Sequence, residues 1–181
     1  VAYGASMLVQ RKFEKLIITR PAVEAGEKLG FLPGDLNEKV DPYLLPVWDA
    51  LADTLGRAEL ERMRADGRIE VAPIAFMRGR TLNRAFVIVD EAQNTSRAQM
   101  QMVLTRLGEG SRMAVTGDPS QCDLLPRDPS GLPHALEILA ETKGVAAIRF
   151  TRADVVRHDL VARIVAAYED DLNKRGGART S

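Results

Sequence analysis

The fold of this chain is decided at residues 86–93, which read FVIVDEAQ. Four apolar, strand-forming residues are followed at once by two carboxylates, Asp90 and Glu91, and then by the amide of Gln93. An apolar run without polar alternation is typical of a strand that is buried on both faces of a parallel sheet. Ligands of such sheets bind beyond the carboxyl ends of the strands, so we expect Asp90 and Glu91 to face a ligand crevice.

Strand-like and helix-like segments alternate on either side of this run, and no internal repeat is present. This alternation predicts an α/β fold with a doubly wound parallel sheet of four or five strands. Ser96 and Gln99 form the sequence pattern of a capping box. The segment 22–41 is rich in Gly, Pro and charge, which favours a long loop. Strands are expected at 15–21, 69–72, 86–89, 113–116 and 146–150, and helices at 1–9, 47–55, 58–66, 96–107 and 132–139 and after Asp154.

The composition excludes several classes of protein. The chain has 181 residues, 45% of them hydrophobic, which favours one domain of ordinary size. Lys+Arg and Asp+Glu balance at 25 each, so no overall charge attracts nucleic acid or a membrane. Cys122 is the sole cysteine, which excludes an intrachain disulfide and fits a reducing cytoplasm. No apolar run approaches the ~20 residues of a membrane span, and no signal peptide is seen.

The two ends of the chain differ in character. The first residue is Val1, and residues 1–9 are small and apolar on nearly every side, as in a helix packed inside a larger body. We therefore expect a longer protein that is truncated here at its amino end. Residues 169–181 are polar and are expected to fray, which leaves one domain over 1–168.

A second polar cluster, Gly117 to Gln121, follows the strand expected at 113–116. One helix and one strand separate it from the first cluster, so a right-handed crossover brings both to one edge of the sheet. The two clusters suit a nucleotide-hydrolysing site, in which Asp90 holds Mg²⁺ and Glu91 orients the attacking water. The alternatives are an ordinary loop-capping role for Asp90 and a purely structural turn at Asp118. No Gly-x-x-x-x-Gly-Lys-[Ser/Thr] phosphate loop occurs in the chain.

Several blocks of the sequence resemble the PhoH-like ATPases, particularly their bacterial PhoL branch. The carboxylate cluster and the Thr-Gly-Asp-x-x-Gln that follows it are also similar to motifs II and III of superfamily-one helicases. The resemblance covers most of the chain, up to about Tyr168. The blocks that carry it are TRPAVEAGE at 19–27, LGFLPGD at 29–35, MRGRTL at 77–82, DEAQNT at 90–95 and DVVRH at 154–158.

The resemblance implies a RecA-like P-loop NTPase core, truncated before its Walker A loop, with ATP and Mg²⁺ as cofactors. Carried over to this chain, Asp90 is the metal ligand and Glu91 polarises water. Gln93 and Gln121 then sense the γ-phosphate. Gly117 and Asp118 belong to the nucleotide-binding wall. A natural member of the family that has lost ATP binding is the alternative to truncation. The path of the loop after Gln121 departs from the usual family pattern.

The arginines allow two interpretations. Arg20, Arg78, Arg80 and Arg84 fall in loops that line the nucleic-acid path of helicase-like domains, and guanidinium groups bind phosphate well. The alternative is a solvated surface with internal ion pairs to Glu24, Glu27 and Asp35. Arg157 lies in the first turn of an expected helix, where a cation is unfavourable. We expect it to act as an arginine finger across a subunit boundary, with packing on Asp154 as the alternative.

The resemblance implies an ATP-driven protein of RNA metabolism that hydrolyses the γ-phosphate bond, and the single cysteine favours the cytoplasm. Its expected partners are RNA, an endoribonuclease or the ribosome, and further copies of itself in a ring, with no membrane. Two other functions stay open. One is a nucleotide-sensing adaptor that hardly turns over, and the other is a non-catalytic binding module for RNA or a ribonuclease.

Overall fold

A computed structural model of the chain describes residues 1–21, 36–124, 128–151, 154, 156, 158–161, 163–165 and 167–168, with the backbone alone for 36–43. The chain divides into two compact units, Val1–Lys143 and Gly144–Ser181. The domain boundary expected at residue 168 stays a prediction.

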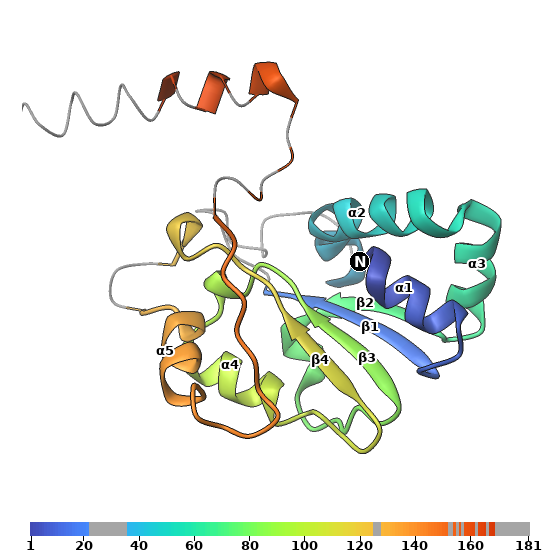
Figure 1. Cartoon of the computed structure of the whole chain (residues 1–181). Helices are drawn as coiled ribbons and strands as arrows, with labels where there is room; N and C mark the ends of the chain where they lie inside the picture. The colour runs from blue at the N-terminus through green and yellow to red at the C-terminus, as the bar shows by residue number, and fades with distance from the viewer. Residues whose placement is uncertain are drawn as a thin grey trace, which may run out of the picture. The chain divides into compact units, whose positions relative to one another are not determined.

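The first unit is built on a parallel sheet of four strands in the order β2-β1-β3-β4 (Figure 1). The strands are β1 Lys15–Arg20, β2 Ile69–Pro73, β3 Ala85–Val89 and β4 Arg112–Val115. The register sets Thr19 opposite Val89, and Val89 opposite Val115. The carboxyl ends of β1, β3 and β4 are therefore level, and the residues that follow them meet at one edge. The predicted α/β fold and parallel sheet are confirmed.

Helices cover both faces of this sheet (Figure 1). On one face lie α1 Ala2–Val9, α2 Leu36–Leu55 and α3 Arg57–Ala65; on the other lie α4 Arg97–Leu104 and α5 Gly131–Ile138. Alternate residues of β3 point to the two layers. Phe86 belongs to the core shared with α1 and α2, and Val87 to the core shared with α4 and α5. All five residues of β3 are buried, which is why its sequence is apolar without alternation.

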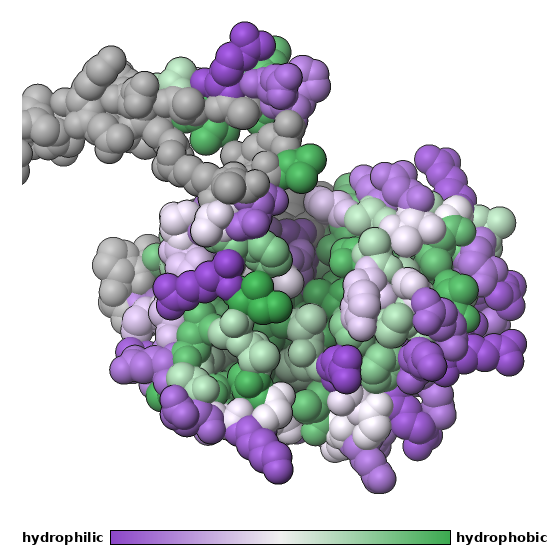
Figure 2. Space-filling model, in the orientation of Figure 1, coloured by the Kyte–Doolittle hydropathy of each residue, from purple (hydrophilic) through white to green (hydrophobic). Residues whose placement is uncertain are grey.

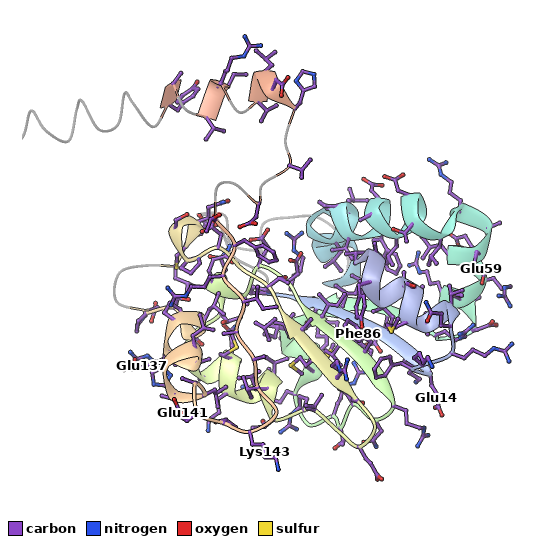
Figure 3. All side chains as sticks on the ribbon, viewed as in Figure 1. Glu14, Glu59, Phe86, Glu137, Glu141 and Lys143 are labelled. Atoms are coloured by element: carbon purple, nitrogen blue, oxygen red, sulfur yellow. The ribbon has the colours of Figure 1, made fainter. Side chains whose placement is uncertain are left out.

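The layer formed by α1, α2 and α3 has an aromatic contact on the side that faces the sheet and charged residues on its outer side. The ring of Phe86, labelled in Figure 3, contacts the rings of Tyr3 and Phe13 edge to face at 5.6 and 5.4 Å. Such contacts add to the burial of apolar surface. The outer face of α3 is hydrophilic (Figure 2), and Glu59 accepts hydrogen bonds there from Arg62. Within the described part of the chain, no helix is both long and apolar enough to span a bilayer.

The capping box at the start of α4 is confirmed. The Ser96 hydroxyl accepts a hydrogen bond from the backbone N–H of Gln99 at 3.2 Å, and the Gln99 side chain accepts one from the N–H of Ser96 at 2.9 Å. These reciprocal bonds satisfy amide groups that the first turn of a helix leaves open. The far end was predicted too late, since α4 stops at Leu104 and Leu107 is exposed outside it.

One other predicted boundary and one predicted strand are wrong. The loop expected over 22–41 ends sooner, because α2 begins at Leu36 and Leu36, Val40, Leu44, Val47 and Leu51 keep helical spacing. Residues 22–35 of that loop lie outside the described residues. The strand expected at 146–150 is absent, and Ile148 and Phe150 are exposed. A strand requires a hydrogen-bonding neighbour, which β propensity alone does not supply.

The helix expected after Asp154 also begins later. Asp154 does not cap it, since its carboxylate accepts hydrogen bonds from the N–H and hydroxyl of Thr151 at 2.7 and 2.8 Å, which lower its pKa. Among the described residues the helix begins at 159. There the Nδ1 atom of His158 accepts from the N–H of Leu160 at 3.2 Å and takes the capping role.

Candidate functional site

The candidate site starts where β3 ends. Asp90 follows the last strand residue, and its backbone N–H still donates to the carbonyl of Thr19 in β1 at 2.8 Å. Glu91 then adopts a left-handed conformation with φ 52° and ψ 38°. This conformation is uncommon and unfavourable for a residue with a long side chain, and such strain gathers at functional sites. It turns the chain sharply into the short 3₁₀ helix η3, Ala92–Asn94.

Arg20 joins the two carboxylates. Its Nε atom lies 3.2 Å from Oδ2 of Asp90, and its Nη2 atom donates to Oε1 of Glu91 at 3.0 Å. The Arg20 side chain is 18% exposed, so these ion pairs are partly shielded from water. The guanidinium offsets the repulsion between two adjacent negative charges. Contact of Arg20 with RNA stays a prediction, whereas its place beside the carboxylate run, expected from the end of the first strand, is confirmed.

Thr116 binds the second carboxylate oxygen of Asp90. It directly follows β4, and its hydroxyl donates to Oδ1 of Asp90 at 2.9 Å. Its carbonyl accepts the N–H of Ala92 at 2.9 Å, which ties the start of η3 to the end of β4. Both oxygens of Asp90 therefore have partners within the protein. The place of Thr116 before Gly117 was the only sequence signal for this contact.

Gln93 connects the two polar clusters, which confirms that they meet at one sheet edge. Its side chain is 1% exposed. Its Nε2 atom donates to Oε2 of Glu91 at 2.6 Å and to the carbonyl of Gln121 at 3.3 Å. Its Oε1 atom accepts the N–H of Asp118 at 3.1 Å. Both ends of the amide are thus bound by protein, and γ-phosphate sensing by Gln93 stays a prediction.

The second cluster forms a compact turn around the 3₁₀ helix η4, Pro119–Gln121. The Asp118 carboxylate accepts hydrogen bonds from the N–H and hydroxyl of Ser120 at 2.9 and 2.7 Å, and from Nε2 of Gln121 at 2.7 Å. The Gln121 side chain is exposed at this edge, in contrast to the buried Gln93. A ligand has access to Gln121, and its predicted contact with phosphate remains to be tested.

Gly117 permits the close approach of the two clusters. A Cβ atom at this position would lie 2.6 Å from Oε1 of Gln93, 2.9 Å from Cδ2 of Leu132 and 3.0 Å from the backbone nitrogen of Gln93. Carbon atoms do not approach their neighbours so closely without displacing them. A side chain at residue 117 would push Gln93 off the N–H of Asp118 and disturb its bond to Glu91.

We expect Gly117→Ala to destabilise the protein by about 1–3 kcal/mol, the usual cost of overpacking. Urea unfolding of the full-length protein measures this cost. In a double-mutant cycle with Gln93→Ala, which removes the nearest clashing atom, the cost of Gly117→Ala should shrink. An equal cost with and without the Gln93 amide would contradict this account of the contact.

A third connection between the clusters was not predicted. The Asn94 side chain accepts the N–H of Asp123 at 2.8 Å and donates to its carboxylate at 3.4 Å. The thiol of Cys122 donates to the carbonyl of Gln93 at 3.4 Å. Asn94 is 6% exposed, so its hydrogen bonds fix the start of the loop after η4. Residues 125–127 of that loop lie outside the described residues.

Of the other predicted arginines, the structure describes Arg78, Arg80 and Arg84, and Arg84 pairs with Glu14 at 2.6 Å. Arg80 forms an ion pair with Glu70 through bonds of 2.5 and 2.8 Å, and this hydrogen bonding lowers the pKa of the half-buried Glu70. Arg78, two residues before Arg80, is exposed. Contact of Arg78 and Arg80 with RNA stays a prediction. Arg157 and the acidic partners proposed at 24, 27 and 35 lie outside the described residues.

The acidic edge has the donors that a magnesium ion requires. Asp90 and Glu91 provide carboxylate oxygens and Thr116 a hydroxyl, all hard ligands of the kind that Mg²⁺ prefers. The described residues contain no group of three or more His, Cys, Asp or Glu side chains able to hold a metal by themselves. Mg²⁺ in nucleotide sites commonly takes one or two carboxylates and completes its shell with water and phosphate oxygens. The residues present therefore fit the carboxylate side of such a site.

The fold and this edge define an α/β domain of RecA-like type with paired carboxylates at its strand ends. The family described as "PhoH-like protein" matches residues 1–169, and the chain belongs to this family. It is 60% identical to the PhoH-like protein of Bacillus subtilis over 156 residues, 86% of this chain and 49% of the relative.

Two further relatives extend the comparison across bacteria. Identity is 58% over 166 residues with the PhoH-like protein of Synechocystis, which covers 92% of this chain and 51% of the relative. Identity is 47% over 169 residues with Protein PhoH of Escherichia coli K12, which covers 92% of this chain and 48% of the relative. The chain thus spans about half the length of these relatives.

Proposed function

We propose that the full protein hydrolyses ATP in the presence of Mg²⁺ at the edge formed by Asp90, Glu91 and Thr116. The observation that carries this proposal is the pair of adjacent carboxylates at the end of a fully buried parallel strand, within a PhoH-family domain. A bound Mg²⁺ would neutralise charge that develops on the phosphates. Asp90 would hold that ion, directly or through its water.

Glu91 is the residue proposed to polarise the attacking water. Its carboxylate lies at the open end of the sheet and is 43% exposed, so water reaches it. Its backbone is fixed by the turn into η3, and Gln93 holds one of its oxygens. A carboxylate held in this way can accept a hydrogen bond from water and direct the lone pair of that water at a phosphorus atom.

The wider role proposed for the protein is RNA metabolism in the cytoplasm. RNA is the favoured ligand, through Arg78, Arg80 and other basic groups, with an endoribonuclease or the ribosome as protein partners. A ring of identical subunits would allow Arg157 to reach a neighbouring site. These proposals rest on the family resemblance and on the exposure of Arg78.

A nucleotide-sensing adaptor is the second candidate, and one observation favours it. Both oxygens of Asp90 and both oxygens of Glu91 already have partners within the protein. A site whose carboxylates are engaged in this way suits slow turnover. An adaptor would bind nucleotide and change its affinity for a partner without rapid hydrolysis.

The two functions are separated by assaying the full-length protein. Phosphate release is measured with ATP and Mg²⁺, with and without single-stranded RNA, and again after chelation of the metal. Metal-dependent hydrolysis that RNA accelerates is the expected result. Tight ATP binding with negligible phosphate release under every condition would establish the adaptor and contradict the ATPase.

A further inference from the structure

We infer that Arg20 is a positioning residue that holds Glu91 in a resting state, and that a phosphate-bearing ligand stimulates hydrolysis by drawing Arg20 away. This inference rests on the proposed ATPase. It begins from the place of Arg20, which is the last residue of β1, next to β3 in the sheet. The register therefore sets its side chain beside the residues that follow β3.

Arg20 binds both carboxylates at once. Its Nε atom contacts the carboxylate of Asp90 and its Nη2 atom contacts the carboxylate of Glu91. One planar group thus fixes the separation and orientation of the two carboxylates. A guanidinium presents several donors in a rigid fork, and it holds such a geometry better than a lysine ammonium can. Neither carboxylate can turn freely while Arg20 stays in place.

The ion pair of Arg20 with Glu91 opposes the proposed role of Glu91, which is to polarise the attacking water. Oε1 of Glu91 accepts a hydrogen bond from Arg20, and Oε2 accepts one from Gln93 at 2.6 Å. Both oxygens therefore already have donors within the protein. Once Arg20 leaves, Oε1 of Glu91 is able to accept a hydrogen bond from water, while Gln93 continues to hold Oε2.

The ion pair of Arg20 with Asp90 likewise opposes the binding of Mg²⁺ by Asp90. Arg20 places a positive charge 3.2 Å from the carboxylate oxygen Oδ2 that faces away from Thr116. A divalent cation at this carboxylate would meet that charge. Arg20 and Mg²⁺ therefore compete for Asp90, and loss of the guanidinium strengthens metal binding even when nucleotide is absent.

The ligand that releases Arg20 must offer it a comparable partner. Arginine binds phosphate as well as it binds carboxylate, often through two parallel hydrogen bonds. Arg20 is partly exposed at the strand end, so the phosphate of a single-stranded RNA can reach it. One residue then links the RNA contact expected of Arg20 to the carboxylates that it binds in the structure.

The test uses the full-length protein with Arg20→Gln and Arg20→Lys. Arg62→Gln is the matched control, because Arg62 forms an exposed ion pair with Glu59 on α3. Isothermal titration with Mg²⁺ alone, without nucleotide, should show about tenfold tighter binding for Arg20→Gln. Arg20→Lys keeps the charge but bridges the pair poorly, so its affinity should fall between those of Arg20→Gln and the parent. Arg62→Gln should match the parent.

Phosphate release supplies the second readout. Arg20→Gln should raise hydrolysis without RNA several-fold and remove the stimulation by RNA, whereas Arg62→Gln should keep the stimulation. Melting temperatures of the variants verify that each is folded. Unchanged Mg²⁺ affinity in a folded Arg20→Gln protein would overturn the inference, as would hydrolysis that falls and is still stimulated by RNA. Absence of hydrolysis in the parent would instead overturn the proposed function, while the Mg²⁺ titration still decides whether Arg20 competes for Asp90.

Discussion

Glu91→Gln should lower ATP hydrolysis by the full-length protein by about 10²- to 10⁴-fold, the range associated with loss of a general base. The substitution keeps the size of the side chain and an oxygen that can accept from Arg20. It removes the negative charge that would attract a proton from the attacking water. Binding of ATP should persist, because Glu91 is proposed to act on water and not on the nucleotide.

Single-turnover phosphate release measures the loss, and equilibrium binding of a fluorescent ATP analogue measures the retained affinity. Glu137→Gln is the matched control: Glu137 is exposed on α5 (Figure 3), and its replacement should leave both quantities unchanged. Hydrolysis by Glu91→Gln at the parent rate would assign the water-polarising role to another residue. Loss of binding together with hydrolysis would show that Glu91 serves the nucleotide or its metal.

The backbone at Glu91 explains why a conservative substitution is needed. The left-handed conformation with φ 52° is available to Gln at about the same cost as to Glu, so the turn into η3 should survive. Glu91→Gly would relax this conformation as well as remove the carboxylate. Its effect would therefore combine backbone freedom with lost chemistry.

Features that depend on local sequence could be predicted. The apolar run 86–89 defined β3, and the spacing of Ser96 and Gln99 defined the start of α4. The meeting of the two polar clusters also followed, because a right-handed crossover between neighbouring parallel strands leaves little choice. The sequence was sufficient here because each signal lies within one element or between successive strands.

Features that depend on long-range geometry could not be predicted in the same way. The ion pairs of Arg20 with Asp90 and Glu91 follow from the register between β1 and β3, which no local pattern specifies. The burial of Gln93 depends on Gly117 and α5 packing around it. The strand expected at 146–150 failed for the same reason, since its apolar residues lack a described neighbour to pair with.

The largest structural effect is expected at Gly131, the first residue of α5. Its N–H donates to the carbonyl of Thr95 at 2.7 Å, and the neighbouring residues Ser96 and Ser130 form an isolated bridge. A Cβ atom at residue 131 would lie 2.6 Å from the carbonyl oxygen of Ser96 and 2.7 Å from Cβ of Met100. Neither atom is the end of a flexible side chain, so relief requires α5 to move away from α4.

Gly131→Ala should therefore destabilise the full-length protein by about 2–3 kcal/mol, the upper part of the range for overpacking. The sign is diagnostic, because Gly→Ala in an unobstructed helix stabilises it by up to about 1 kcal/mol. Urea unfolding provides the measurement, and Glu137→Ala on the exposed face of the same helix should change stability by less than about 0.5 kcal/mol. Equal or greater stability for Gly131→Ala would mean that α5 does not pack on α4 as closely as the structure shows. Since α5 also contacts η3, the same displacement should loosen Gln93 and, through it, Glu91.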